Sequence, residues 1–245
     1  MSVAETEFAA LLDHAHSDPN VVGLLLAGSR GKGEYVTNES DYDAYVILSD
    51  GRVLDEYADR FPSAHGDPVE YILLSLDSFR AHALPGSPSR WNAYTFAHIE
   101  PLIDKLDGEI GRIASAKTLP HPDDAREFLG GYLNQYYRAK KNLAAGRELE
   151  GHLDAAESIV WLLDFLFAAH DRVRPFNKWL LWELQHHPLA EPWRDNLLPR
   201  IETILSSGDG ETQRNLFRDA EAFARTRGFG AIVDSWGPDV EFMRA

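Results

Sequence analysis

The sequence predicts an α+β region followed by an all-α region, and three observations support this fold class. In the first half, short segments rich in β-branched and aromatic residues alternate with amphipathic helical segments. The segment Leu119-Pro-His-Pro122 then interrupts the pattern. From Asp123 onward the sequence reads as nearly continuous helix, with prolines between the helices. We therefore divide the chain into residues 1–120 and 121–245.

The first half begins with a predicted helix over residues 2–17, because Ser2 followed by Glu5 is a capping box. Segments with strand composition follow at about 21–27, 41–48 and 68–75, and a fourth within His98–Asp104. Helices are predicted near 53–60, near 76–83 and over 109–117.

The second half is predicted to be a helical bundle. Its helices are expected at about 123–146, 152–171, 176–186, 192–206 and 210–227. Large aromatic side chains on these segments are expected to pack the core of the bundle rather than stack on a nucleobase: Trp161, Phe165, Trp179 and Trp182.

Composition excludes several classes of protein. A chain of 245 residues with 44% apolar content can fill one large core or two modest ones. The absence of cysteine excludes disulfides, thiolate-bound zinc and thiol catalysis. The N-terminal segment lacks the features of a signal peptide, and the most apolar helix candidate, Ser158–Ala169, is too short to span a bilayer. We expect a soluble cytoplasmic protein with no membrane partner.

The formal net charge is −15, from 39 acidic and 24 basic residues. A surface of this sign repels a nucleic-acid backbone, and no basic stripe interleaved with aromatic residues is present. The sequence thus predicts no nucleic-acid partner and favours a cationic small substrate. The alternative is that the acidic balance serves solubility alone.

The segment Val21–Leu48 carries the strongest functional signal. An apolar run ends at Gly28-Ser29, and eleven residues separate Ser29 from the pair Asp41 and Asp43. Side chains two apart on a strand share a face, so the two carboxylates would stand side by side and repel each other unless a cation lies between them. Mg²⁺ suits such an all-oxygen site, while Gly28 and Ser29 could approach a phosphate.

An alternative interpretation places Gly28-Ser29 in a turn and the two aspartates on a solvated edge strand. Tyr45 and Ile47 argue against it, because they continue the face of Asp41 and Asp43 with apolar side chains.

These residues resemble the signature of the nucleotidyltransferase superfamily, in which a strand ends in Gly-Ser and Asp-x-Asp opens the next strand. Gly28, Ser29, Asp41 and Asp43 match it, with Ser40 before the pair. The resemblance is specific over about residues 20–75. It implies a nucleotidyltransferase-type mixed sheet with flanking helices.

In architecture, the chain also resembles the aminoglycoside- and lincosamide-type (kanamycin-like) enzymes, which have a catalytic half followed by a helical half. By this resemblance, residues 1–120 would be a nucleotidyltransferase catalytic domain and residues 121–245 a helical substrate-binding domain.

The resemblance also implies a third acid on a neighbouring strand. Glu70 is the acid within the predicted strand 68–75, flanked by Val69 and Tyr71. Two Mg²⁺ ions could then be held by Asp41 and Asp43, with Glu70 touching one metal or the incoming hydroxyl. The alternative is an ordinary edge-strand glutamate that faces water.

Basic residues are the candidates for holding the nucleotide. Asn134, Arg138 and Lys141 fall at i, i+4 and i+7 of one helix and could face the catalytic cleft, or form a solvated basic face. Lys178 could reach a phosphate from the segment between two helices, and Arg30 follows Ser29 directly.

Relatives of the kanamycin type use a glutamate of the helical domain as the base for the acceptor hydroxyl. Glu157, which opens the apolar run ESIVWLLDFLF, is the candidate here. The alternative is that Glu157 pairs with the dipole of a helix N-terminus. The acceptor is expected in an acidic cleft near Glu70 and Glu157.

The sequence therefore predicts an enzyme, a Mg²⁺-dependent nucleotidyltransferase. It would move a nucleoside monophosphate, AMP from ATP in the first instance, to a hydroxyl of a small molecule and release pyrophosphate. An aminoglycoside-like antibiotic is the leading acceptor implied by the resemblance, and the protein would act as a monomer or homodimer. Two alternatives stay open: a protein adenylyltransferase of the antitoxin type, and a non-catalytic nucleotide-sensing or interaction module.

Overall fold

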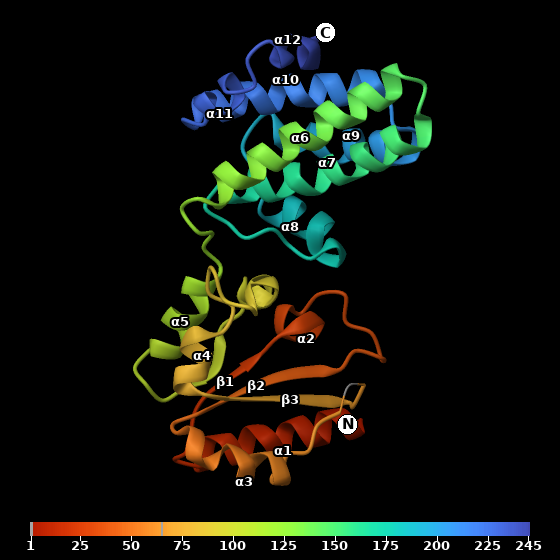
Figure 1. The fold of residues 1–245 in the computed structure, drawn as a ribbon. Coiled ribbons are helices and arrows are strands. Elements are labelled where there is room, and N and C mark those ends of the chain that lie inside the picture. Colours follow the sequence, from red (N-terminus) through yellow and green to blue (C-terminus); the bar gives the residue numbers. More distant parts are fainter. Residues whose placement is uncertain (1, 65) are drawn as a thin grey trace. The chain divides into compact units, whose positions relative to one another are not determined.

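The computed structural model describes residues 2–64 and 66–245. It divides into two compact units, unit 1 up to Leu119 and unit 2 from Pro120 (Figure 1). Unit 1 holds a four-stranded mixed sheet with flanking helices, and unit 2 is helical. The predicted fold class is confirmed.

The sheet of unit 1 has the strand order β3-β2-β1-β4. Its strands are β1 (Val21–Leu26), β2 (Tyr42–Leu48), β3 (Val69–Ser75) and β4 (Pro101–Asp104). β1 pairs antiparallel with both β2 and β4, whereas β2 and β3 are parallel. β1 and β2 occupy the centre, which is why both are buried almost throughout.

Helices cover both faces of this sheet (Figure 1). On one side lie α1 (Val3–Ser17) and α3 (Leu54–Arg60), which share a core with Leu24, Ala44 and Val46. On the other side lie α4 (Leu76–Ala81), the 3₁₀ segment η2 (Arg90–Phe96) and α5 (Glu109–Lys117). The short segments α2 (Gly28–Lys32) and η1 (Gly51–Val53) complete the unit.

The start of α1 confirms the predicted capping box. The Ser2 hydroxyl accepts from the Glu5 backbone N–H at 3.1 Å, and the Glu5 carboxylate accepts from the Ser2 N–H at 2.7 Å.

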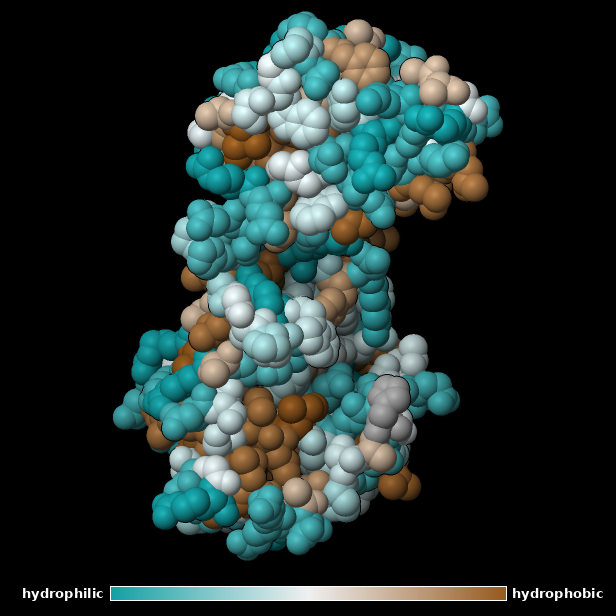
Figure 2. All heavy atoms as spheres, in the orientation of Figure 1, coloured by the Kyte–Doolittle hydropathy of each residue, from teal (hydrophilic) through white to brown (hydrophobic). Residues whose placement is uncertain are grey.

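β3 is an edge strand, and its side chains are less buried than those of β2. Ile72, Leu73 and Leu74 are half-buried, and apolar surface lies over this part of unit 1 (Figure 2). Glu70 therefore lies near the start of a strand whose outer edge is unpaired within the described sheet.

Unit 2 packs its two long helices, α6 (Asp124–Ala144) and α7 (Glu148–Ala168), against each other. The remaining elements are η3 (Asn177–Trp179), α8 (Leu180–His186), α9 (Trp193–Ser207), α10 (Gly210–Thr226), α11 (Gly230–Asp234) and α12 (Asp239–Arg244). Gly131 of α6 permits close packing, because a Cβ there would lie 2.4 Å from the Trp161 ring of α7. The predicted aromatic core is confirmed: Phe165, Trp179 and Trp182 are buried, and Trp161 packs against the core cluster.

The structure differs from the sequence-based prediction in a few elements. The helix predicted at 152–171 begins at Glu148, and the predicted helix 176–186 is η3 followed by α8. The short helices α2, α11 and α12 were not predicted, since each is too short to show helical periodicity. Within the described residues, every helix is too short or too polar to cross the hydrocarbon core of a bilayer.

Candidate metal centre and nucleotide site

Strand register brings three carboxylates of unit 1 together. In the parallel β2–β3 pair, Asp43 lies directly opposite Glu70. Asp41 precedes β2 by one residue and shares the face of Asp43, because it lies two residues away along an extended backbone. Each of the three residues offers one carboxylate oxygen, and these oxygens lie within 4.8 Å of one another.

The opposite face of β2 holds this arrangement in place. The Tyr42 ring stacks on Phe8 of α1 at 4.5 Å, and the Tyr42 N–H donates to the Pro68 carbonyl at 3.1 Å. With Tyr42 anchored towards α1, its neighbours Asp41 and Asp43 must point away from that helix.

The Gly28-Ser29 pair lies against the acidic cluster. The Ala27 N–H donates to the Asp43 carbonyl at 2.9 Å, so the end of β1 is held beside the start of β2. Gly28 has φ +64°, and a Cβ at this position would lie 2.0 Å from Asp43 Oδ2. Only glycine permits this contact, in conformation and in space. Ser29 follows as the second residue of α2 and is buried.

Arg30 holds the loop that leads to Asp41. Its Nε donates to the Ser40 carbonyl at 2.8 Å, and its guanidinium lies 4.2 Å from the centroid of the Tyr42 ring. The structure thus shows a positioning contact for Arg30, and binding of phosphate by this residue stays a prediction.

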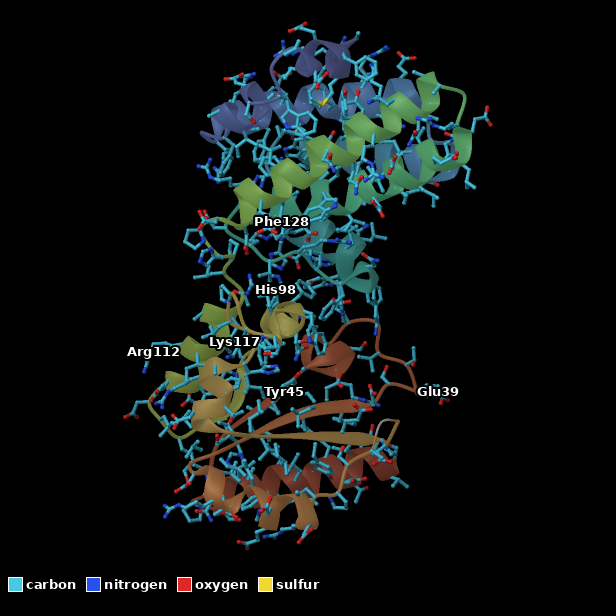
Figure 3. The ribbon with its side chains drawn as sticks, viewed as in Figure 1. Glu39, Tyr45, His98, Arg112, Lys117 and Phe128 are labelled. Carbon is cyan, nitrogen blue, oxygen red and sulfur yellow. The ribbon has the colours of Figure 1, made fainter. Side chains whose placement is uncertain are left out.

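A buried polar network lies next to the acidic cluster, around Tyr45 on the same face of β2 as Asp43. The Tyr45 hydroxyl accepts from Asn92 Nδ2 at 2.7 Å, and Asn92 Nδ2 lies 3.0 Å from His82 Nε2. Burial raises the pKa of Tyr45, and the charge of Asp43 raises it further. Tyr45 and Lys117 lie in the interior between the sheet and helices α4 and α5 (Figure 3).

Lys117 is fully buried at the end of α5. Its Nζ donates to the carbonyls of Phe79 and of His82, the latter at 2.7 Å, and these carbonyls belong to the last turn of α4. Burial lowers the pKa of Lys117 to about 8. Burial also lowers the pKa of His82, with the nearby charge of Lys117 as a second cause.

The predicted basic candidates of the helical half lie in unit 2. Asn134, Arg138 and Lys141 are exposed on α6, where Arg138 Nε lies 3.5 Å from Asp154 Oδ1. Lys141 Nζ lies 5.2 Å from the Tyr137 ring centroid. Lys178 is exposed on η3, 5.5 Å from the Trp179 ring centroid. Their roles towards a nucleotide stay predictions.

Glu157 lies in the middle of a helix. Because α7 begins at Glu148, the interpretation of Glu157 as a charge at a helix N-terminus is wrong. Its carboxylate is exposed and accepts a hydrogen bond from Gln135 Nε2 at 2.5 Å.

Asp164 is a further acid on α7 that was not predicted to be a site residue. It is half-buried, 3.5 Å from Arg174, and burial raises its pKa while Arg174 opposes the shift. An acid within the apolar run of α7 was the available signal.

No protein-family model matches the chain, and no curated protein matches it. Among solved structures, a nucleotidyltransferase-like protein from Exiguobacterium sibiricum 255-15 is similar over 99% of this chain and 80% of its own, with a TM-score of 0.42 and 13% identity. At this level of similarity, an assignment of function rests on the site itself.

Proposed function

We propose that the chain is a nucleotidyltransferase in which Asp41, Asp43 and Glu70 hold Mg²⁺. The observation that carries the proposal is the convergence of these three carboxylates, within 4.8 Å, beside Gly28 and Ser29 at the start of α2. The donor set fits the ion, because Mg²⁺ prefers carboxylate oxygens and is usually shared with substrate phosphates. Three carboxylates this close also repel one another, which a bound cation relieves.

The residues of unit 1 would each have a defined part in the transfer. Asp41 and Asp43 would hold the metal, and Glu70 would contact the metal or the acceptor hydroxyl. The Ser29 hydroxyl and the nearby backbone N–H groups contact a phosphate. When bound, Mg²⁺ neutralises charge on the phosphate oxygens. The chain's own contribution is then to align the acceptor oxygen and the α-phosphate.

The reaction is an in-line displacement. A bond forms between the acceptor oxygen and the α-phosphorus of ATP, the bond to pyrophosphate breaks, and the hydroxyl proton passes to a carboxylate base. Glu157 is the proposed base. Asp164, a half-buried acid on the same helix that lies 3.5 Å from Arg174, is the alternative to be compared with it.

The proposed acceptor is a small hydroxylated molecule, with aminoglycoside-like antibiotics as the first class to test. The acidic balance of the chain, 39 acids against 24 bases, supports a cationic acceptor and disfavours nucleic acid. In this proposal unit 1 is the catalytic domain and unit 2 contributes to acceptor binding, with Arg138, Lys141 and Lys178 as candidates for contacts to the triphosphate.

Two measurements test the proposal. Thermal shift with ATP, in the presence of Mg²⁺ or EDTA, reports metal-dependent nucleotide binding. Pyrophosphate release is then followed across aminoglycosides, lincosamides and other hydroxylated metabolites. Asp43→Asn should lose turnover by several orders of magnitude and keep its fold, whereas Asp59→Asn, an exposed acid on α3, is the matched control.

Each outcome has a distinct meaning. A Mg²⁺-dependent shift with turnover of a small molecule supports the proposal. A shift with adenylylation of a co-purifying protein would favour a protein adenylyltransferase, and a shift without any transfer would favour a nucleotide-sensing module. No shift with any nucleotide would reject the site assignment.

A further inference from the structure

Asp41 is the member of the acidic cluster whose position the sheet does not fix. The register of β2 with β3 begins at Tyr42 and Val69, so Asp41 lies one residue outside the described ladder. Asp43 and Glu70, in contrast, lie opposite each other within it. Asp41 is also exposed, so little packing holds its side chain. The convergence of the three carboxylates therefore depends on contacts that fix the backbone around Asp41.

The loop that precedes Asp41 is fixed in shape by its own hydrogen bonds. The Ser40 N–H donates to the Thr37 carbonyl at 3.2 Å, and the Thr37 N–H donates to Ser40 Oγ at 2.9 Å. Residues 35–39 are exposed, and Glu39 lies on the outer side of the loop (Figure 3). Because both hydrogen bonds lie within the loop, they set its turn but not its distance from the sheet.

Arg30 of α2 holds this loop from outside. Its Nε donates to the carbonyl of Ser40, directly before Asp41, at 2.8 Å. Its Cζ lies 4.2 Å from the ring centroid of Tyr42, directly after Asp41, and the Tyr42 ring stacks on Phe8 of α1 at 4.5 Å. Arg30 therefore contacts the chain on both sides of Asp41 and connects it to the packed face of the sheet.

The backbone of Arg30 is itself fixed against β2. The Ala27 N–H, directly before α2, donates to the Asp43 carbonyl at 2.9 Å, and the Glu34 N–H, directly after the C-cap of α2, donates to the Ser29 carbonyl at 3.1 Å. The side chain of Arg30 suits its position because a planar guanidinium can donate along its edge and stack through its face. A lysine ammonium is a point charge and cannot make both contacts in this geometry.

We propose that Arg30 is a positioning residue of the metal site, which sets the affinity for the divalent cation by fixing Asp41 through Ser40 and Tyr42, and is not a ligand of the phosphates. The inference rests on the proposed function, because it requires the acidic cluster to bind metal. It predicts the opposite of simple electrostatics. Loss of a positive charge close to a cation site would by itself strengthen cation binding. Loss of a group that orients a metal ligand weakens it, by about 10–100-fold.

The test measures binding of Mn²⁺ to the full chain without nucleotide, from the electron paramagnetic resonance signal of free Mn²⁺. The wild type should bind saturably, and Asp43→Asn should lose this binding, which assigns it to the acidic cluster. Arg30→Met and Arg30→Lys should each bind at least about tenfold more weakly. Arg60→Met is the matched control, because Arg60 is an exposed arginine of unit 1 whose Cζ lies 5.5 Å from the Phe61 ring centroid. It should bind Mn²⁺ as the wild type does.

Nucleotide affinity separates positioning of the metal ligand from contact with phosphate. At saturating Mn²⁺, the affinity of Arg30→Met for ATP, measured by isothermal titration calorimetry, should equal that of the wild type. Weaker ATP binding with unchanged Mn²⁺ binding would show that Arg30 is a phosphate ligand, and would overturn the proposal. Thermal melting in EDTA, followed by circular dichroism, checks that each variant is folded. Arg30→Lys, which keeps the charge, serves as the second variant.

Failure of this inference can be told apart from failure of the proposed function. If the wild type binds no Mn²⁺, or if Asp43→Asn binds it equally well, the metal site is wrong and the inference falls with it. If these two proteins behave as expected but the Arg30 variants bind Mn²⁺ as tightly as the wild type or more tightly, only the inference is overturned. Equal losses in Arg30→Met and Arg60→Met would overturn it as well.

Discussion

At the scale of single residues, the acidic cluster depends on a glycine as much as on its carboxylates. Gly28 adopts φ +64°, and its α-carbon faces the Asp43 carboxylate so closely that a Cβ would lie 2.0 Å from Oδ2. The Gly-Ser pair at the start of α2 and the Asp-x-Asp pair are therefore one structural unit, although eleven residues separate them in sequence.

Gly28→Ala should abolish metal-dependent activity, because the new methyl group displaces the Asp43 carboxylate. The matched control is Gly33→Ala, since Gly33 has a similar φ of +69° but open space where a Cβ would lie. Both variants should lose about 1 kcal/mol or more of stability from the left-handed backbone. Turnover and Mg²⁺-dependent thermal shift should be lost only in Gly28→Ala. Equal turnover in the two variants would show that this contact is dispensable.

The base can be identified by comparing two isosteric variants. Glu157→Gln should lower kcat and leave the affinity for ATP unchanged, because a base acts on the acceptor proton and not on the nucleotide. Asp164→Asn is the counterpart on the same helix. If Asp164→Asn alone lowers kcat, with the pH–rate profile losing its acidic limb, Asp164 is the base and the assignment of Glu157 is wrong.

At the scale of elements, β2 carries different chemistry on its two faces. Its Tyr42, Ala44 and Val46 face packs on α1, while the other face presents Asp43 at one end and Tyr45 beneath the helices α4 and η2. Beyond Asp43, the same face of β2 continues with the buried apolar residues Tyr45 and Ile47. Their burial in the core fixes the strand and thereby the position of Asp43 at its end.

The contact between α4 and α5 depends on a buried amine. Lys117 Nζ caps the last carbonyls of α4, and burial lowers its pKa from 10.5 to about 8. Between these two pH values the unfolded chain binds more protons than the folded chain, so this group makes folding more favourable as the pH rises.

We therefore compare the free energy of unfolding of the wild type with that of Lys117→Met. The difference, wild type minus variant, should rise between pH 8 and 10.5. The slope should reach up to about 1.4 kcal/mol per pH unit and should vanish below this window. Urea unfolding across this range measures it. Lys105→Met is the control, because Lys105 also donates to two carbonyls, at 2.7 Å each, but is exposed. A pH-independent difference for Lys117→Met would contradict the assignment of a buried titrating amine.

At the scale of the whole molecule, the excess of 15 negative charges should act on any charged acceptor. Such an effect is long-range and is screened by salt over a distance of about 10 Å at 0.1 M. It differs in this respect from the close contacts of the metal site.

For a cationic aminoglycoside acceptor, KM should rise with ionic strength while kcat changes little, because screening weakens the encounter and not the aligned complex. A neutral hydroxylated acceptor, measured over the same salt series, is the control and should show little change in KM. Parallel salt dependence for both acceptors would show that the net charge does not contribute to acceptor binding.

The α+β and all-α fold class, most helices and strands, and the residues of the Gly-Ser and Asp-x-Asp pattern could be predicted from the amino-acid sequence. These features depend on local periodicity, capping and residue spacing, which involve residues close together in sequence and do not require the rest of the fold. The capping box of Ser2 and Glu5 is the clearest case, since both partners lie within one helical turn.

The contacts between residues that are distant in sequence could not be predicted in this way and are seen in the folded chain. The pairing of Asp43 with Glu70 and the contact of Gly28 with Asp43 Oδ2 each join separate elements. Strand register and helix packing set such contacts, and both depend on the burial of the whole core rather than on any local pattern. For the same reason the position of Glu157 within α7 was missed: the helix begins at Glu148, where packing against α6 extends it beyond its apolar run.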